Sequence, residues 1–213
     1  MTTVLLIRHG FSVTNQRGIF TGQTDVALDE IGVKQALLTA RFVFDRYNVD
    51  AIYSSDLIRA LDTAAPLAEK TGKPIIKDAR LREINGGVWE GKKVEDIIRE
   101  YPDEYYIWKN NIGIGRPVGG ESVAELQARA SDVVLRIAEE NPDKTVAIFT
   151  HACFIRTLQC LYQSLPLTEM KNIDWVPNAS VTEVAIACGN AKIIKLAQAK
   201  HLESLETVLN SKL

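Results

Sequence analysis

Val4-Leu5-Leu6-Ile7-Arg8-His9-Gly10 is the stretch on which the interpretation of the fold depends. Its four apolar residues, two of them β-branched, indicate a strand that is buried on both faces. The run ends at a cation, an imidazole and a glycine, and open α/β sheets bind ligands just beyond the carboxyl ends of such strands. An arginine beside a histidine there predicts an anion site in which the histidine attacks or transfers a proton. Taken alone, the triplet fits an ordinary surface turn equally well.

Two further expected strands lead to side chains of the same kind. A strand at 145–150 ends on His151, and the helix that follows another strand carries Arg59. We expect both to share one pocket with Arg8 and His9, because parallel strands end at the same edge of a sheet. Guanidinium groups match phosphoryl oxygens, and helix N-termini add N–H donors. Neighbouring cations lower an imidazole pKa, so the pattern predicts two neutral histidines, one of which can act as a nucleophile in phosphoryl transfer.

Apolar periodicity predicts the helices between the strands. They are expected at 30–44 after an Asp29 cap, 57–65, 94–110 with a break near Pro102, 123–137 behind a Ser122/Glu125 capping box, 152–162 and 201–209. The first helix is expected to bury Val33, Leu37, Ala40 and Phe44. Pro66 is expected to kink or end the second.

The strands complete the expected architecture. Besides the two already named, they are expected at 51–54, 74–78, 181–187 and 191–196. The strand at 74–78 opens on a proline, which favours an edge position, and the last two form a terminal hairpin. Strands that alternate with helices and end in a hairpin imply α/β architecture. We therefore expect a single domain over 1–213, with a mostly parallel mixed sheet sandwiched between helix layers.

Composition limits the partners and the compartment. A net charge of −2 gives no bulk attraction to nucleic acid or to an anionic membrane, and no apolar run has the length of a membrane span. Cys153, Cys160 and Cys188 are odd in number and lack CxxC spacing, so we expect buried thiols and no zinc site. A core strand follows the N-terminus at once, which leaves no room for a signal peptide. We expect a cytoplasmic protein.

A series of motifs extends over nearly the whole chain. These are Leu6-Ile7-Arg8-His9-Gly10 with Ser12 and Asn15, Thr21-Gly22 with Asp25, Tyr53-Ser54-Ser55-Asp56-Leu57-x-Arg59-Ala60, Leu81-Arg82-Glu83 with Gly87, Gly119-Gly120-Glu121-Ser122, Thr150-His151 and Asn178-Ala179-Ser180-Val181. Each motif is modest alone. Together, and in this order, they closely resemble the histidine phosphatase superfamily in its phosphoglycerate-mutase-like branch, which implies a phosphoglycerate-mutase-like fold.

The resemblance implies a role for each residue of the site. His9 would be the nucleophile that becomes phosphorylated, and Arg8, Arg59 and His151 would hold the phosphoryl oxygens. Glu83 would protonate the leaving oxygen and then activate water. The substrate side would be lined by the family's loop, here Asn15, Thr21, Gly22 and Gln23, with Ala152 in place of the family's usual glycine. The family needs neither metal nor another cofactor, and its substrates are small phosphorylated metabolites.

Departures from the mutase pattern favour hydrolysis. Phe11 stands where mutases have a glutamate, and Gly86 where they have a tyrosine. The lysine and paired arginines that grip a glycerate carboxylate have no evident counterparts between Lys92 and Arg116. We therefore expect a phosphomonoester hydrolase. A cofactor-dependent phosphoglycerate mutase is the nearest alternative, and a non-catalytic phosphate-binding protein is a more distant one.

Some assignments stay open at this level. Glu90 and Glu121 are alternatives to Glu83 as the acid, and the aromatic residues near Trp108 form either core or a lid over the substrate. Phe11 and these aromatic residues favour an apolar or ring-bearing leaving group. His201 is expected to be solvated. A homodimer is one open oligomeric state.

Overall fold

A computed structural model of the chain describes residues 1–207. Its centre is a six-stranded sheet with the strand order β3-β2-β4-β1-β5-β6. The strands are β1 (Thr2–Arg8), β2 (Ala51–Ser54), β3 (Ile75–Lys77), β4 (Thr145–Thr150), β5 (Val181–Ala187) and β6 (Asn190–Gln198). The first four are parallel, whereas β5 and β6 are antiparallel to their neighbours. The predicted fold class is confirmed, and β3 lies at the edge as its proline indicated.

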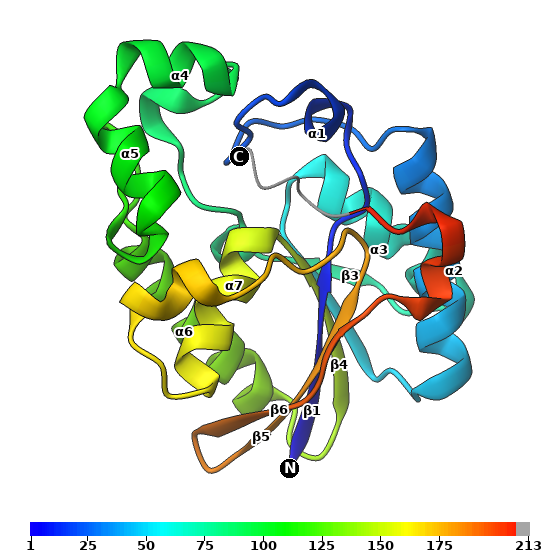
Figure 1. Ribbon diagram of the computed structural model, residues 1–213. Coiled ribbons are helices and arrows are strands. Elements are labelled where there is room, and N and C mark those ends of the chain that lie inside the picture. Colours follow the sequence, from blue (N-terminus) through cyan, green and yellow to red (C-terminus); the bar gives the residue numbers. More distant parts are fainter. Residues whose placement is uncertain (208–213) are drawn as a thin grey trace.

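Helices cover both faces of this sheet (Figure 1). One face carries α2 (Glu30–Arg46) and α3 (Ile58–Thr71), and the other carries α6 (Val123–Glu140) and α7 (Ala152–Tyr162). Shorter helices are α1 (Val13–Arg17), α4 (Val94–Glu100) and α5 (Pro102–Asn110), with 3₁₀ turns at Ala79–Leu81, Gly87–Trp89, Ile112–Ile114, Leu167–Asn172 and Lys200–Leu205. The helix between 94 and 110 breaks near Pro102 as predicted, and the Ser122/Glu125 capping box is present.

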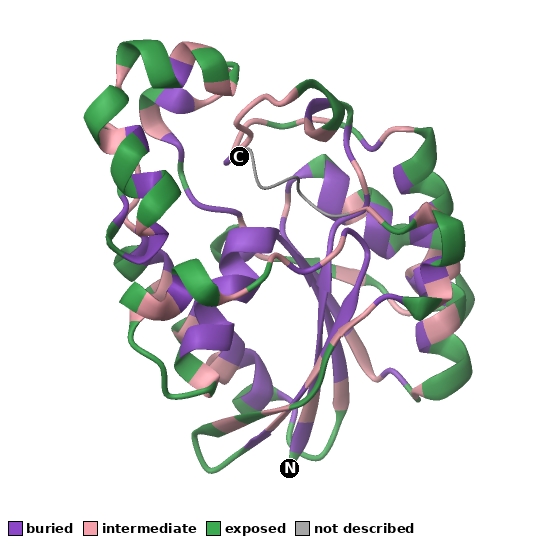
Figure 2. Ribbon diagram, viewed as in Figure 1, coloured by how far each residue is buried: buried purple, intermediate pink, exposed green. Residues whose placement is uncertain are grey.

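The alternation of side chains along β1 explains why its whole apolar run is buried. Val4 and Leu6 pack in the core beneath α6 and α7, while Leu5 and Ile7 pack beneath α2 and α3. A strand covered on both faces needs apolar residues at every position. Figure 2 shows this arrangement as buried strands between helices whose outer faces are exposed. The strand therefore delivers the residues after Ile7 to the end of a rigid core element.

The prediction for the buried face of α2 was wrong. Val33, Leu37 and Phe44 are about half exposed, and of the predicted set only Ala40 is buried. The buried face consists of smaller side chains because the helix approaches the neighbouring backbone closely. A Cβ added at Gly32 would lie 2.0 Å from the carbonyl oxygen of Phe11. The helical periodicity is present, but close packing places a face with smaller side chains against the sheet.

Pro66 does not end α3, because the helix continues to Thr71. A proline inside a helix costs about 3 kcal/mol through the lost hydrogen bond and a steric clash. The buried face of this helix, which includes Ala60, Ala64 and Leu67, packs against the sheet on both sides of Pro66. We attribute the uninterrupted helix to this packing.

Three expectations near the C-terminus also change. The helix expected at 201–209 is a 3₁₀ segment at Lys200–Leu205, and 208–209 lie outside the described residues. His201 is not simply solvated, because its ring stacks on Phe42 with centroids 4.3 Å apart. Cys188 is exposed, whereas the other two cysteines are buried as expected.

Candidate active site

Two strand ends bring His9 and His151 together. β1 and β4 are adjacent and parallel, with Arg8 opposite Thr150 in the register. The residue that follows each strand is a histidine, and the two ring centroids are 5.2 Å apart. The contact between these residues, which are distant in sequence, therefore follows directly from the strand pairing.

The environment of His9 fixes its proton on one ring nitrogen. Nδ1 lies 2.7 Å from the carbonyl oxygen of Gly10, and a carbonyl oxygen only accepts, so Nδ1 carries the proton. Nε2 is left with its lone pair. Burial, followed by the charges of Arg59 and Arg8, holds the pKa of His9 well below its usual value. His9 is therefore a neutral imidazole with a free Nε2 at neutral pH, which is the nucleophilic form.

His151 is a fully buried imidazole that is also neutral. Burial and the charge of Arg59 hold its pKa well below the usual value. Its Nε2 lies 2.9 Å from Ser55 Oγ, which also accepts the backbone N–H of Leu57 at 3.3 Å. A hydroxyl oxygen accepts two hydrogen bonds and donates one, so this contact fits either tautomer of His151. Nδ1 has no hydrogen-bond partner among the described residues, and in the tautomer that carries the proton there it is a donor available to an anion.

Arg8 and Arg59 are buried cations whose guanidinium groups are anchored to backbone carbonyls. Arg8 Nη1 donates to Val176 at 2.6 Å, while its buried Nε has no partner within the described chain. Arg59 donates to Thr24 at 2.9 Å and to Gly22 at 2.7 Å. Burial lowers the pKa of Arg8 to about 9 and that of Arg59 to about 10, so both remain charged at neutral pH. Buried, fixed guanidinium groups suit a dianion.

Glu83 is the buried carboxyl of the site. Its oxygens accept backbone N–H groups from Ile84 at 2.9 Å, Cys153 at 3.0 Å and Phe154 at 3.3 Å. Burial nevertheless raises its pKa, against the opposing effect of these bonds and of the two arginines. A raised pKa favours the protonated form that a general acid requires. Its alternatives are used elsewhere, since Glu90 binds the backbone N–H of Gln23 and Glu121 pairs with an arginine.

These five residues, Arg8, His9, Arg59, Glu83 and His151, are called the polar cluster below. A cavity of about 80 Å³ opens next to the cluster. Its lining includes Arg8, His9 and Glu83, together with the predicted substrate-side residues Asn15, Thr21, Gly22 and Ala152. Arg59 and His151 lie deeper and are almost completely buried. Gln23 lies outside the described lining, and its Nε2 donates to the carbonyl of Glu83 at 3.1 Å.

Much of the remaining lining of the cavity is apolar. We define the apolar wall as Ile19, Phe20, Ile84, Trp108 and Trp175. Phe20 contacts Trp108 edge-on, with ring centroids 5.6 Å apart, and Trp108 is buried. Of the aromatic residues left between core and lid, Trp89 and Tyr105 are core, Trp108 is both core and wall, and Tyr106 is exposed.

The sequence interpretation gave no role to several contributors to the cavity and its neighbourhood, among them Ser55 and Trp175. Ser55 lies within a recognised motif but was given no role, although it bonds to His151. Trp175 was missed because it lies in an irregular segment between α7 and β5, where no periodicity marks a wall residue. Phe11, which had favoured an apolar substrate, lies outside the described lining of the cavity.

Within residues 1–207, no group of three or more His, Cys, Asp or Glu side chains is arranged to hold a metal ion. No helix in the same range is both long and apolar enough to cross a membrane.

Comparison with known proteins identifies the family. The sequence profile of the histidine phosphatase superfamily (branch 1) matches residues 4–199. The chain belongs to this superfamily. It is 31% identical to phosphoserine phosphatase 1 of Hydrogenobacter thermophilus, across 95% of both chains. It is 30% identical to the metal-independent phosphoserine phosphatase of Arabidopsis thaliana, across 96% of this chain and 85% of the relative.

The fold comparison agrees. The solved structure of Bacillus stearothermophilus YhfR superposes with a TM-score of 0.91, at 30% identity over 95% of this chain and 100% of that one. The protein is thus a phosphomonoesterase of the histidine phosphatase superfamily that acts on a small phosphorylated metabolite. The family, fold and enzyme class expected from the sequence are confirmed.

Proposed function

We propose that the protein hydrolyses phosphomonoesters in two steps through a phosphohistidine at His9. In the first step Nε2 of His9 attacks phosphorus and the ester oxygen leaves with a proton from Glu83. In the second step Glu83 takes a proton from water, and the hydroxide displaces Nε2 and releases phosphate. The observation that carries the proposal is the fixed tautomer of His9, whose Nδ1 is bound to Gly10 and whose Nε2 is free.

The other members of the polar cluster stabilise the charge of the transferring group. Arg8 Nε and His151 Nδ1 are buried and have no partners in the described chain. Arg8 Nε is a donor, and we propose that His151 carries its proton on Nδ1, so that both donate to phosphoryl oxygens. Arg59 supplies a second fixed cation. The side chains thereby provide the charge that a metal supplies in other phosphatases, so we propose that catalysis needs no metal or other cofactor.

The substrate side supports hydrolysis of an ester with an apolar or ring-bearing alcohol. The charged residues of the cavity lining are Arg8 and Glu83, both in the polar cluster, whereas the apolar wall supplies much of the remaining lining. A carboxylate or ammonium group on the alcohol would find no paired charge among the described lining residues, and burying an unpaired charge is costly. The same lack of cations disfavours the bisphosphorylated intermediate of a mutase.

Hydrolysis of p-nitrophenyl phosphate with EDTA, by the wild type and by His9→Ala, tests the mechanism between about pH 5 and about pH 8. EDTA-resistant activity that the substitution abolishes supports the proposal. Activity that EDTA removes contradicts it. A panel of monoesters then tests the substrate class, and a preference for small polyanions such as bisphosphoglycerate contradicts the apolar alcohol.

The cysteines bear on where the protein acts. All three are free, and two of them are buried. Unpaired buried thiols fit a reducing compartment, so we propose that the protein acts in the cytoplasm.

A further inference from the structure

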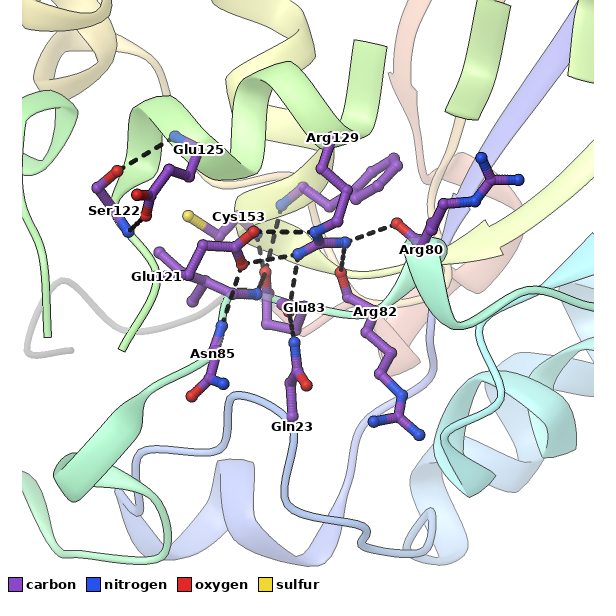
Figure 3. A network of polar contacts seen from close by, with 12 residues as sticks. Gln23, Arg80, Arg82, Glu83, Asn85, Glu121, Ser122, Glu125, Arg129 and Cys153 are labelled. Atoms are coloured by element: carbon purple, nitrogen blue, oxygen red, sulfur yellow. Dashed lines mark hydrogen bonds and ion pairs between the residues drawn. The ribbon is translucent and has the colours of Figure 1, made fainter. Parts of the chain in front are cut away.

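Arg129, on α6, lies beside the segment that carries Glu83 and has no part in the chemistry proposed above. Its Nε and Nη2 donate to the two carboxylate oxygens of Glu121 at 2.9 and 2.8 Å. Its Nη1 donates to the carbonyl oxygens of Arg80 and Arg82 at 2.6 and 2.9 Å, and Nη2 reaches that of Glu83 at 3.2 Å. A guanidinium has five N–H donors, and these five bonds use all of them (Figure 3).

The segment that Arg129 holds has little regular structure of its own. It runs from the 3₁₀ turn at Ala79–Leu81 to the next turn at Gly87–Trp89, outside the sheet. Glu121 supports the same segment, because its carboxylate accepts the N–H of Asn85 and its own N–H donates to the carbonyl of Asn85. Hydrogen bonds from side chains therefore hold this backbone in place. For the backbone that carries the two histidines, hydrogen bonds between strands do the same.

Arg129 and Glu121 are both largely shielded from solvent. The side chains of Arg129 and Glu121 are 20% and 15% exposed, respectively. Their opposite charges offset each other, so the pair adds little net charge to the site. Its principal effect is geometric, since a shift of the Glu83 backbone would separate the carboxyl from the N–H groups of Cys153 and Phe154.

We propose that Arg129, oriented by Glu121, is a positioning residue that holds residues 80–85 so that the Glu83 carboxyl reaches the leaving oxygen. The inference rests on the proposed role of Glu83 as the general acid. Its consequence is a dependence on the leaving group. An alkoxide must be protonated as it leaves, whereas the anion of an acidic phenol leaves without a proton.

The test compares an alkyl phosphate with 2,4-dinitrophenyl phosphate as substrates for Arg129→Gln. The quantity to compare is kcat/KM, which reports the steps up to release of the alcohol and excludes the later attack of water. We expect kcat/KM for the alkyl ester to fall roughly 10- to 100-fold, and kcat/KM for the aryl ester to fall by less than about threefold. Glu83→Gln should show the same selectivity with a larger loss. The matched control is Arg136→Gln, because Arg136 is on the same helix and binds Asp78 and Glu140 rather than the segment's carbonyls. It should leave the ratio of the two rates unchanged.

The outcomes separate the two proposals. Equal losses on both esters in Arg129→Gln, with Glu83→Gln selective, overturn the positioning role alone. A Glu83→Gln variant without selectivity overturns the proposed acid, whatever Arg129 does. If Arg129→Gln does not fold, Arg129→Lys keeps the charge but cannot form the five bonds. A smaller selective loss in Arg129→Lys supports the proposal, and wild-type or unselective rates overturn it.

Discussion

Arg8, His9 and Glu83 of the polar cluster line the same cavity as the apolar wall. Apart from Glu83, which directly precedes the wall residue Ile84, the two regions come from different parts of the fold. His9 and His151 directly follow two adjacent core strands, and Arg59 lies in the first turn of α3. The wall comes from loops and from short helical segments outside the sheet. The comparison indicates a division of tasks, in which the sheet fixes the groups that handle phosphorus and the loops select the alcohol.

Burial separates the two regions as well. The members of the polar cluster are between 0% and 8% exposed, and their backbone and carbonyl contacts leave little freedom. Fixed charges in a water-poor site stabilise a transition state without reorganisation. Trp175 and Phe20 are only partly buried, so the wall has more room to adapt. Substitutions of the cluster residues other than Glu83 should therefore slow every substrate, whereas substitutions in the wall should change the order of preference.

The largest expected effect comes from His9→Ala. Removing the nucleophile should lower kcat by roughly 10⁴- to 10⁶-fold for all phosphomonoesters, because both steps pass through Nε2. Initial rates on an aryl and an alkyl ester measure the loss. His201→Gln, which removes a histidine far from the cavity, should retain activity. Substantial residual turnover in His9→Ala would place the nucleophile elsewhere.

Arg59→Gln should have the next largest effect. It removes a buried cation whose charge acts on both histidines, and loss of one such group lowers kcat by roughly 10²- to 10³-fold. The loss should again be uniform across esters. Arg41→Gln serves as the control, because Arg41 is an exposed helical arginine paired with Asp45. A loss confined to one class of alcohol would contradict the division between cluster and wall.

Trp175→Ala tests the wall itself. We expect kcat/KM for ring-bearing esters to fall about tenfold, since an aromatic contact worth roughly 1.5 kcal/mol is removed, with little change for a small alkyl ester. Tyr106→Ala, which truncates an exposed aromatic residue outside the cavity lining, should change neither rate. Equal losses on ring-bearing and alkyl esters would show that Trp175 does not select the alcohol.

The smallest effect concerns stability and pH. The pKa of His151 is lowered in the folded protein from a usual value of 6.5. As pH falls below that value, the unfolded chain takes up a proton that the folded protein does not. This histidine therefore lowers the free energy of unfolding by up to ~1.4 kcal/mol per pH unit on the acid side. Urea unfolding near pH 5.5 and pH 7.5 should show a shallower pH dependence for His151→Gln. Equal pH dependence in both proteins would contradict the buried neutral imidazole.

The sequence predicted the sheet and the strand-end residues well for a physical reason. Apolar runs identify buried strands, and a residue directly after such a strand lies at its carboxyl end. The positions of His9 and His151 could therefore be predicted. The buried face of α2 was predicted wrongly, because large apolar residues lie outside where small ones allow close approach at Gly32. Hydrophobicity alone does not report that distance.

Contacts to backbone atoms were the hardest to anticipate. Arg129 recognises three carbonyl oxygens, and a carbonyl has the same chemistry whichever residue carries it. The sequence therefore contains no sign of the pairing. Trp175 was hidden for a related reason, since irregular segments have no period that reveals which way a side chain faces.

Rapid quenching of the enzyme during turnover of a phosphomonoester, followed by mass spectrometry of its peptides, tests the central claim most directly. The account predicts one phosphoryl group on the peptide that contains His9, stable in alkali and labile in acid, and absent from His9→Ala. A phosphoryl group on another residue would contradict the account. So would a steady state with no phosphorylated enzyme together with inversion of configuration at phosphorus, because direct attack by water inverts that centre.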